Sequence, residues 1–168
     1  MRIFGLAGWS GSGKTTLMAG LIPELVARGL KVSTIKHAHH EFDIDQPGKD
    51  SWRHRQAGAG EVMVASSRRW ALMHELRGQP EPTLDELVAQ MSPVDLLLVE
   101  GFKSHPHPKL EVHRPSLGKP LIYLDDPYVV AIAADEPVAA PVPLLPLGDP
   151  AAVARFILDH FGAASWRS

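Results

Sequence analysis

The stretch Gly8-Trp9-Ser10-Gly11-Ser12-Gly13-Lys14-Thr15 decides the fold, because it matches G-x-x-x-x-G-K-[ST], the pattern of a phosphate-binding loop. Its glycines allow successive backbone N–H groups to turn toward phosphate oxygens. Lys14 adds a positive charge at the β- and γ-phosphates, and the Thr15 hydroxyl is a ligand for Mg²⁺. The pattern predicts a nucleoside triphosphate bound by Gly8, Ser10, Gly11, Ser12, Gly13, Lys14, Thr15 and Thr16.

The residues on either side of the loop supply the context that this motif requires. Residues 2–7 form a short apolar run that predicts a buried strand. Residues 15–28 carry leucines at helical spacing and are followed by Gly29, so a helix is expected to begin at the loop. The positive end of its dipole would face the bound anion.

Apolar strands alternate with helices along the rest of the chain. Strands are expected over residues 31–36, 61–66, 69–74, 94–99, 110–113, 120–124 and 129–134, and helices over 50–57, 83–91 and 150–160. Thr83 and Glu86 are expected to form a capping box for the second of these helices, and Asp149 to cap the third. This order predicts an α/β protein with a three-layer P-loop NTPase-like fold, in which helices cover both faces of a mostly parallel central sheet. No linker divides the chain, so residues 1–168 are expected to form a single nucleotide-binding domain.

An acid that assists Mg²⁺ should close another buried strand, because ligands of such sheets bind beyond the carboxyl ends of the strands. Asp95 opens the apolar run of residues 96–99 and Glu100 closes it, so only Glu100 lies at the correct edge. We expect Lys14 and Glu100 to be the catalytic residues, and Glu100 to act near Mg²⁺ with Thr15. The alternative for Glu100 is a solvated strand end. Gly101 after it indicates that the backbone passes close to another group.

Residues 37–50 form a polar segment with three histidines, at positions 37, 39 and 40. Three interpretations stay open: a zinc site, a polar loop that contacts nucleotide or substrate, and plain exposure to solvent. Asp43 and Asp50 are candidates for outer-sphere contact with Mg²⁺. Asp50 is also placed to cap a helix that runs through Ala57.

The base of the nucleotide has one candidate contact. Guanine-specific P-loop proteins use an aspartate that accepts hydrogen bonds from N1 and N2 of the base, but the usual N-K-x-D sequence is absent here. Asp135 follows the strand expected over residues 129–134, at the same edge as the phosphate loop. We therefore expect Asp135 to contact the base; the alternative is a turn residue.

Composition excludes several classes of protein. The 168 residues are 45% hydrophobic and 21% charged and contain no cysteine, so a disordered chain, a disulfide scaffold, a Cys-ligated zinc site and thiol catalysis are excluded. The net charge of −2 gives no support for binding to nucleic acid or to an anionic membrane. No apolar run approaches the ~18 residues of a membrane span, and a cytoplasmic location is expected.

Several segments of the chain are more specific than the P-loop. These are residues 8–16, Thr34-Ile35-Lys36-His37, Phe42-Asp43 with Pro47-Gly48-Lys49-Asp50-Ser51, Ala57-Gly58-Ala59, and Val99-Glu100-Gly101-Phe102-Lys103. Together and in this order they resemble the MobB family of molybdopterin-guanine dinucleotide biosynthesis adapter proteins.

The resemblance implies a dimeric GTP-binding protein with weak GTPase activity, of the P-loop class that includes MinD-like and dethiobiotin-synthetase-like folds. It also implies assistance to the guanylyltransferase MobA, which attaches GMP to molybdopterin. The residues that carry over are Gly8 to Thr16, Glu100 at the Walker B position, and Asp50 as a loop acid. The expected ligands and partners are GTP, Mg²⁺, a MobA-like guanylyltransferase, a second copy of the chain and, as a candidate, molybdopterin.

Two other functions fit the same motif. One is a small-molecule kinase or ligase that uses ATP, and the other is a binding module that senses nucleotide without turnover. A nucleoside-type kinase usually adds an arginine-rich lid, whereas the arginines here are dispersed apart from Arg68-Arg69. No glutamine or arginine finger can be identified, so we expect at most a slow GTPase.

Overall fold

A computed structural model describes residues 1–38, 42–162 and 166 of the chain. These residues form two compact units, the first of Met1–His37 with Met91–Ser168 and the second of Ala38–Gln90. A single domain over residues 1–168 stays a prediction.

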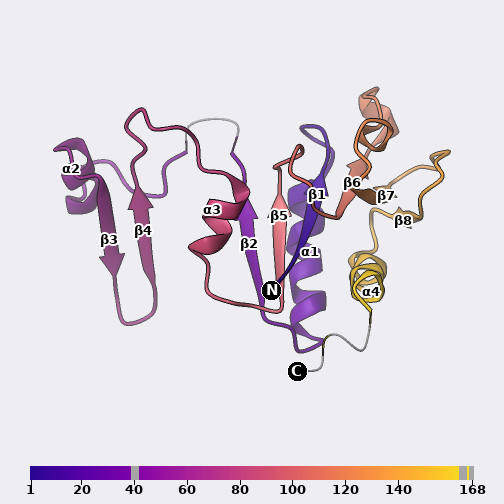
Figure 1. Ribbon diagram of the computed structural model, residues 1–168, viewed down its shortest axis with the longest axis horizontal. Helices are drawn as coiled ribbons and strands as arrows, with labels where there is room; N and C mark the ends of the chain where they lie inside the picture. The colour runs from indigo at the N-terminus through magenta and orange to yellow at the C-terminus, as the bar shows by residue number, and fades with distance from the viewer. Residues whose placement is uncertain (39–41, 163–165, 167–168) are drawn as a thin grey trace. The chain divides into compact units, whose positions relative to one another are not determined.

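The first unit is built on a six-stranded sheet with the order β2-β5-β1-β6-β7-β8 (Figure 1). Its strands are β1 (Arg2–Ala7), β2 (Val32–Lys36), β5 (Leu96–Glu100), β6 (Lys109–His113), β7 (Val129–Ala134) and β8 (Leu144–Pro146). Each neighbouring pair in this sheet is parallel, which confirms the predicted α/β fold with a parallel central sheet. The carboxyl ends of all six strands therefore meet at one edge.

Two helices, α1 (Lys14–Val26) and α4 (Pro150–His160), pack on the same face of this sheet. Alternate residues of the strands face them, so Leu96 and Leu98 of β5 and Leu110 and Val112 of β6 join one core with the buried side of α1. Asp149 caps α4 as expected, since its carboxylate accepts a hydrogen bond from the N–H of Ala152 at 2.9 Å. This face therefore holds α1, and with it the phosphate loop, against the carboxyl edge of the sheet.

Buried charged groups of β6 hold loops over the opposite face of the sheet. The Lys109 ammonium is 1% exposed and donates to Asp126 Oδ2 at 2.8 Å, and also to the carbonyls of Lys103 and His105. The Glu111 carboxylate accepts the backbone N–H groups of Ile122 and Tyr123 at 2.9 and 3.0 Å. These bonds satisfy the charges that burial would otherwise penalise.

The same bonds explain one wrong prediction. Residues 120–124 are not a strand, because Ile122–Leu124 is a 3₁₀ helix (η2), preceded by another at Pro115–Leu117 (η1). The N–H groups of Ile122 and Tyr123 are taken by a buried carboxylate instead of by a neighbouring strand. A hydropathy pattern cannot reveal such a bond.

Strand β8 is a second difference, since none of the strands expected from the sequence covers Leu144–Pro146. It has three residues and ends in Pro146, and it pairs with β7 at the edge of the sheet. Proline is tolerated at an edge because one side of an edge strand makes no ladder bonds. The prolines of this segment therefore removed the residue pattern by which a strand is usually predicted.

The second unit contains helix α2 (Asp50–Gln56), the antiparallel hairpin of β3 (Glu61–Ala65) and β4 (Trp70–His74), and helix α3 (Leu84–Ala89). Thr83 and Glu86 form the predicted capping box of α3. Arg55 ties the unit together, since its guanidinium pairs with Asp43 at 2.7 Å, Asp45 at 3.3 Å and Glu75 at 2.8 Å. Asp50 does not cap α2: the N-cap is Lys49, and Asp50 is the first helical residue, where its charge still suits the helix dipole.

Candidate nucleotide-binding site

The phosphate loop connects the end of β1 to the start of α1, as the motif requires. Gly8, with φ 156°, passes so close to β6 that a Cβ on it would lie 2.5 Å from the carbonyl oxygen of Val112. Gly13 is the N-cap of α1 with φ 101° and ψ 11°, a left-handed conformation that side chains disfavour. The Ser12 side chain is buried, so only its backbone is placed to meet a phosphate. The loop thus presents main chain, rather than side chains, at the amino end of α1.

Lys14 lies back across this loop. Its ammonium group donates to the carbonyls of Gly8 at 3.0 Å and Trp9 at 2.9 Å. Burial lowers the pKa of Lys14, and the positive charges of Lys103 and Lys36 lower this pKa further, while Glu100 opposes them. Three ammonium groups and one carboxylate therefore act on one another here, and the excess positive charge suits an anionic ligand.

Glu100 lies beside Thr15, so the structure brings together the two residues expected to serve Mg²⁺. The Thr15 hydroxyl donates to Glu100 Oε1 at 3.1 Å, and Lys36 Nζ is 3.7 Å from the same oxygen. In the sheet Glu100 is paired with Leu6 of β1 and Lys36 of β2, which places it between their two ends. Hydroxyl and carboxylate oxygens are ligands that Mg²⁺ accepts, so this pair fits the ion chemically.

Asp95, the acid at the other end of β5, has a different partner. Its Oδ2 accepts the N–H of Lys31 at 2.7 Å, next to the start of β2. The two acids of the strand are therefore distinguished as the sequence predicts: Asp95 joins two elements at the amino edge, and Glu100 faces the phosphate loop.

The backbone after Glu100 passes close to His37, which agrees with the close approach expected from Gly101. A Cβ on Gly101 would lie 2.6 Å from the Cβ of His37, and Phe102, with φ 49°, stacks on the His37 ring at 4.7 Å. Two of the characteristic segments, Ile35-Lys36-His37 and Glu100-Gly101-Phe102, thus form one structure. His39 and His40 lie outside the described residues. Within those residues, no group of three or more histidine and acidic side chains is arranged to hold a metal ion.

Trp9 packs against other loops of its own unit. Its indole N–H donates to the carbonyl of Pro120 at 2.8 Å, and the ammonium groups of Lys103 and Lys119 lie 4.6 and 5.8 Å from its ring centroid. Such cation–π contacts fix the large side chain within the loop. Trp9 therefore links the phosphate loop to the segment after Glu100, a role that its position alone did not reveal.

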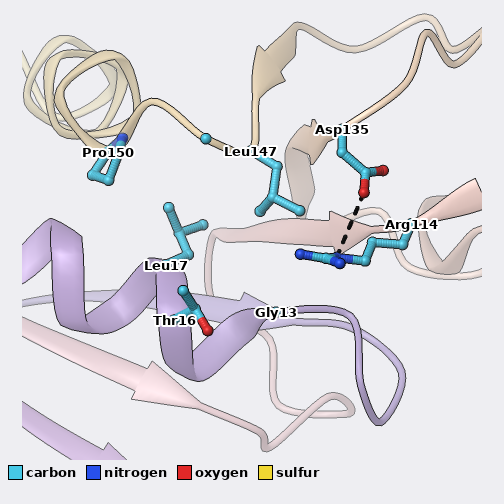
Figure 2. Close-up of a pocket in the computed structure, with 8 residues that line it drawn as sticks. Gly13, Thr16, Leu17, Arg114, Asp135, Leu147 and Pro150 are labelled. Atoms are coloured by element: carbon cyan, nitrogen blue, oxygen red, sulfur yellow. Dashed lines mark ion pairs between the residues drawn. The ribbon is translucent and has the colours of Figure 1, made fainter.

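A cavity of about 270 Å³ adjoins the phosphate loop at Gly13 (Figure 2). Asp135 lines it and faces Arg114, a residue that no sequence motif singles out, and the contact of Asp135 with a base stays a prediction. Arg114 Nε is 3.6 Å from Asp135 Oδ2 and donates to the carbonyl of Ser12 at 3.2 Å. Arg114 follows β6 directly, so the rule that ligands meet strand ends was the signal that could have found it.

Asp50 and Asp43 belong to the second unit. The guanidinium of Arg55 holds the pKa of Asp43 below its ordinary value by direct hydrogen bonds. Asp43 therefore has an arginine partner within its own unit, and an outer-sphere contact from either acid stays a prediction.

Helices that could cross a membrane were sought in the described part of the chain, and none there combines the necessary length with enough apolar residues.

The sequence matches the family model of molybdopterin guanine dinucleotide synthesis protein B, MobB, over residues 3–135. Two relatives carry the name molybdopterin-guanine dinucleotide biosynthesis adapter protein. The one from Haemophilus influenzae is 46% identical over 96% of this chain and 92% of its own length. The one from Escherichia coli is 44% identical over 94% of this chain and 91% of its own length.

Solved structures give the same result. A crystal structure of molybdopterin-guanine biosynthesis protein B aligns with a TM-score of 0.74 at 26% identity, covering 94% of this chain and 99% of that chain. The structure of Bacillus subtilis MobB also aligns with a TM-score of 0.74 at 26% identity, covering 94% and 96%. The phosphate loop, the acid beside it, the sheet that carries both and these matches all agree, and the chain belongs to the MobB family.

Proposed function

We propose that this chain is an adapter protein of molybdopterin guanine dinucleotide biosynthesis that binds Mg·GTP and hydrolyses it slowly. The observation that carries the nucleotide part is the contact of Thr15 with Glu100, 3.1 Å apart beside Lys14. A glycine-rich turn that binds no ligand does not require a strand-terminal carboxylate beside its threonine. Two relatives named as adapter proteins, each aligned over more than nine tenths of its length, support the pathway.

The groups in place support binding of a triphosphate. The N–H groups of residues 11–15 at the start of α1 would meet the phosphates, and the Lys14 ammonium, which now donates to the carbonyls of Gly8 and Trp9, would donate to the phosphate oxygens instead. Thr15 and Glu100 would hold Mg²⁺. The ion supplies charge neutralisation at the β- and γ-phosphates.

The partners of the cations near the loop support slow hydrolysis. The charged neighbours that act on Lys14 are Lys36, Lys103 and Glu100. Arg114, the arginine beside the loop, donates to the carbonyl of Ser12 and faces Asp135, whereas the arginine finger of fast GTPases binds the transition state directly with a rigid, bidentate fork. We therefore propose that GTP serves mainly as a bound ligand, and that the partner is the guanylyltransferase that attaches GMP to molybdopterin.

We also propose that the protein is a homodimer. The β3–β4 hairpin pairs Met63 with Leu72 and Ala65 with Trp70, so these four side chains share one face. Met63, Trp70 and Leu72 are 60, 66 and 42% exposed. An exposed apolar face on a two-stranded sheet favours burial against a second copy. Light scattering of the wild type should give twice the 18.3 kDa chain mass, and Trp70→Lys should give the monomer.

The adapter role is tested by reconstitution. Purified guanylyltransferase, molybdopterin and Mg·GTP are incubated with no addition, with the wild type, or with Lys14→Ala, and the guanine dinucleotide formed is measured. We expect the wild type to raise the rate or yield and Lys14→Ala to have no effect. No gain with the wild type would contradict the adapter role, and an equal gain with Lys14→Ala would show that nucleotide binding is not part of it. A phosphorylated small-molecule product made from ATP would instead indicate a kinase.

A further inference from the structure

The cavity beside Gly13 is continuous with the phosphate loop. Gly13 and Thr16, both in the P-loop motif and its first helical turn, line it together with Arg114 and Asp135. A nucleotide whose phosphates lie at the amino end of α1 must extend its sugar and base to one side of that helix. The cavity lies beside Gly13 and Thr16 at the start of α1, so it is placed to receive the sugar and base.

The walls of the cavity suit a flat heterocycle. Leu17 of α1 and Leu147 after β8 provide apolar surface, with Pro150 at the start of α4 (Figure 2). Gly148 is open enough that a Cβ there would meet nothing within 4 Å. The volume of about 270 Å³ is near the lower end of the range for small-molecule sites, roughly 300–1,000 Å³. Apolar walls with a few polar groups at the rim are typical of such sites.

The two polar groups at the rim are placed there by the sheet. Leu110 and Val112 of β6 and Ala131 and Ala133 of β7 face α1, so the alternation of strands brings the next residues, Arg114 and Asp135, to the same side. The last paired residues of these strands are His113 and Ala134, one step earlier. Arg114 and Asp135 are thus neighbours, and their side chains are 42 and 37% exposed, within reach of a ligand.

We propose that this cavity binds the guanine base, and that Arg114 and Asp135 select guanine over adenine. The proposal rests on the binding of Mg·GTP at the phosphate loop. Guanine carries two acceptors, O6 and N7, next to two donors, N1–H and the N2 amino group. A guanidinium donates to the first pair and a carboxylate accepts from the second, and the two lie side by side here at 3.6 Å.

Adenine does not match this pair of groups. It presents the N6 amino donor where guanine has O6, and the acceptor N1 where guanine has N1–H. The donor would then face Arg114 and the acceptor would face Asp135. Polar groups left unpaired in this way are the basis of strong discrimination between similar ligands. Opening the Arg114–Asp135 ion pair to admit guanine requires little, because exposed ion pairs contribute little stability.

Arg114 also connects the base to the phosphates. It donates to the carbonyl of Ser12, inside the phosphate loop. A Cβ on Gly13 would be 3.5 Å from its guanidinium, so the two groups are neighbours. A base that engages Arg114 therefore changes a group bonded to the loop that holds the phosphates. This contact gives the site a route by which the identity of the base affects phosphate binding.

The test uses calorimetric titration of the full chain with GTP, ATP and xanthosine triphosphate, each with Mg²⁺. Xanthine has an oxygen in place of the N2 amino group, so an asparagine amide can donate to it where an aspartate repels it. We expect the wild type to prefer GTP over ATP by at least tenfold. Asp135→Asn should weaken GTP at least tenfold, leave ATP unchanged and strengthen xanthosine triphosphate. Arg114→Gln should weaken GTP about tenfold with little effect on ATP.

Glu136→Gln is the matched control, since it removes one exposed acid at the next position and should change none of these affinities. Equal affinity of the wild type for GTP and ATP, or Asp135→Asn and Arg114→Gln with an unchanged GTP-to-ATP ratio, would overturn the proposal. In that case Lys14→Ala should still weaken the binding of both GTP and ATP, because the phosphate site is intact in the wild type. This separates failure of the base proposal from failure of the phosphate site. Failure of the phosphate site would appear as no binding of any triphosphate to the wild type. Thermal melting of each variant confirms that it is folded.

Discussion

The hydroxyl of Thr15 donates a hydrogen bond to the carboxylate of Glu100 at 3.1 Å, across 85 positions of the sequence. Thr15 lies in the first turn of α1 and Glu100 at the end of β5, and the pairing of β5 with β1 brings them to one edge. This contact places an acid beside the phosphate loop.

Substitution of Glu100 by glutamine should remove most of the effect of Mg²⁺ on GTP binding. The amide keeps the hydrogen bond from Thr15 but loses the charge that attracts the cation. We expect the ratio of GTP affinities with and without Mg²⁺ to fall about tenfold, measured by titration calorimetry. Asp95→Asn is the control at the other end of the strand and should keep the ratio. An unchanged Mg²⁺ dependence in Glu100→Gln would mean that another group serves the ion.

Substitution of Gly8 by alanine should destabilise the first unit. A Cβ at this position would lie 2.5 Å from the Val112 carbonyl oxygen and 2.6 Å from Ser12 Oγ, on a backbone with φ 156°. We expect a loss of about 2–4 kcal/mol in the free energy of unfolding, from strain and overpacking. Urea denaturation measures it. Gly60→Ala, at a position where a Cβ would meet nothing within 4 Å, should change stability by less than about 0.5 kcal/mol.

Removal of one partner of the Lys109–Asp126 ion pair should lower the free energy of unfolding. Lys109 is 1% exposed, so Asp126→Ala leaves a buried charge that donates to the carbonyls of Lys103 and His105 and has lost its carboxylate partner. We expect a loss of about 3 kcal/mol in urea denaturation. The double variant Lys109→Met with Asp126→Ala should recover part of it, because it removes the buried charge. A double variant as unstable as the sum of the two single variants would contradict the coupling.

Stability should fall in mild acid because of His107. Burial first, then the charges of Lys109 and His105, lower the pKa of His107 to about 4. The unfolded chain, with a histidine pKa near 6.5, therefore binds more protons between about pH 6.5 and 4, and stability is lost as the pH falls through this window. One pKa unit corresponds to about 1.4 kcal/mol, so we expect a loss of a few kcal/mol across this window.

The variant His107→Gln checks this assignment. Glutamine carries a polar side chain that does not titrate, so the slope of unfolding free energy against pH should become shallower between pH 6.5 and 4. A slope equal to that of the wild type would assign the acid sensitivity to other groups.

The parts of the fold that could be predicted from the sequence are those with strong local signals. The phosphate loop, its strand and its helix follow from glycines, Lys14 and a run of spaced leucines, and the capping residues Thr83 and Asp149 marked two helix starts. The segment of residues 120–124 could not be predicted, because its conformation depends on bonds to the distant Glu111.

The candidate site shows the same division. Glu100 could be found because it ends a uniformly apolar strand, and the position of Asp135 after β7 was likewise readable. The position of Arg114 after β6 could be predicted as well, but its contact with Asp135 depends on the register of β6 and β7. The orientation of the Trp9 side chain depends on its hydrogen bond to the carbonyl of Pro120, 111 positions away in the sequence.

Binding of Mg·GTP by the phosphate loop can be measured in one calorimetric comparison. GTP with Mg²⁺ is titrated into the wild type, in which the Lys14 ammonium donates to the carbonyls of Gly8 and Trp9, and into Lys14→Ala, which lacks that ammonium. We expect saturable binding to the wild type and a loss of affinity of about 100-fold in the variant, since a charged partner of the phosphates is removed. Equal affinity in the two proteins, or no binding to either, would contradict it.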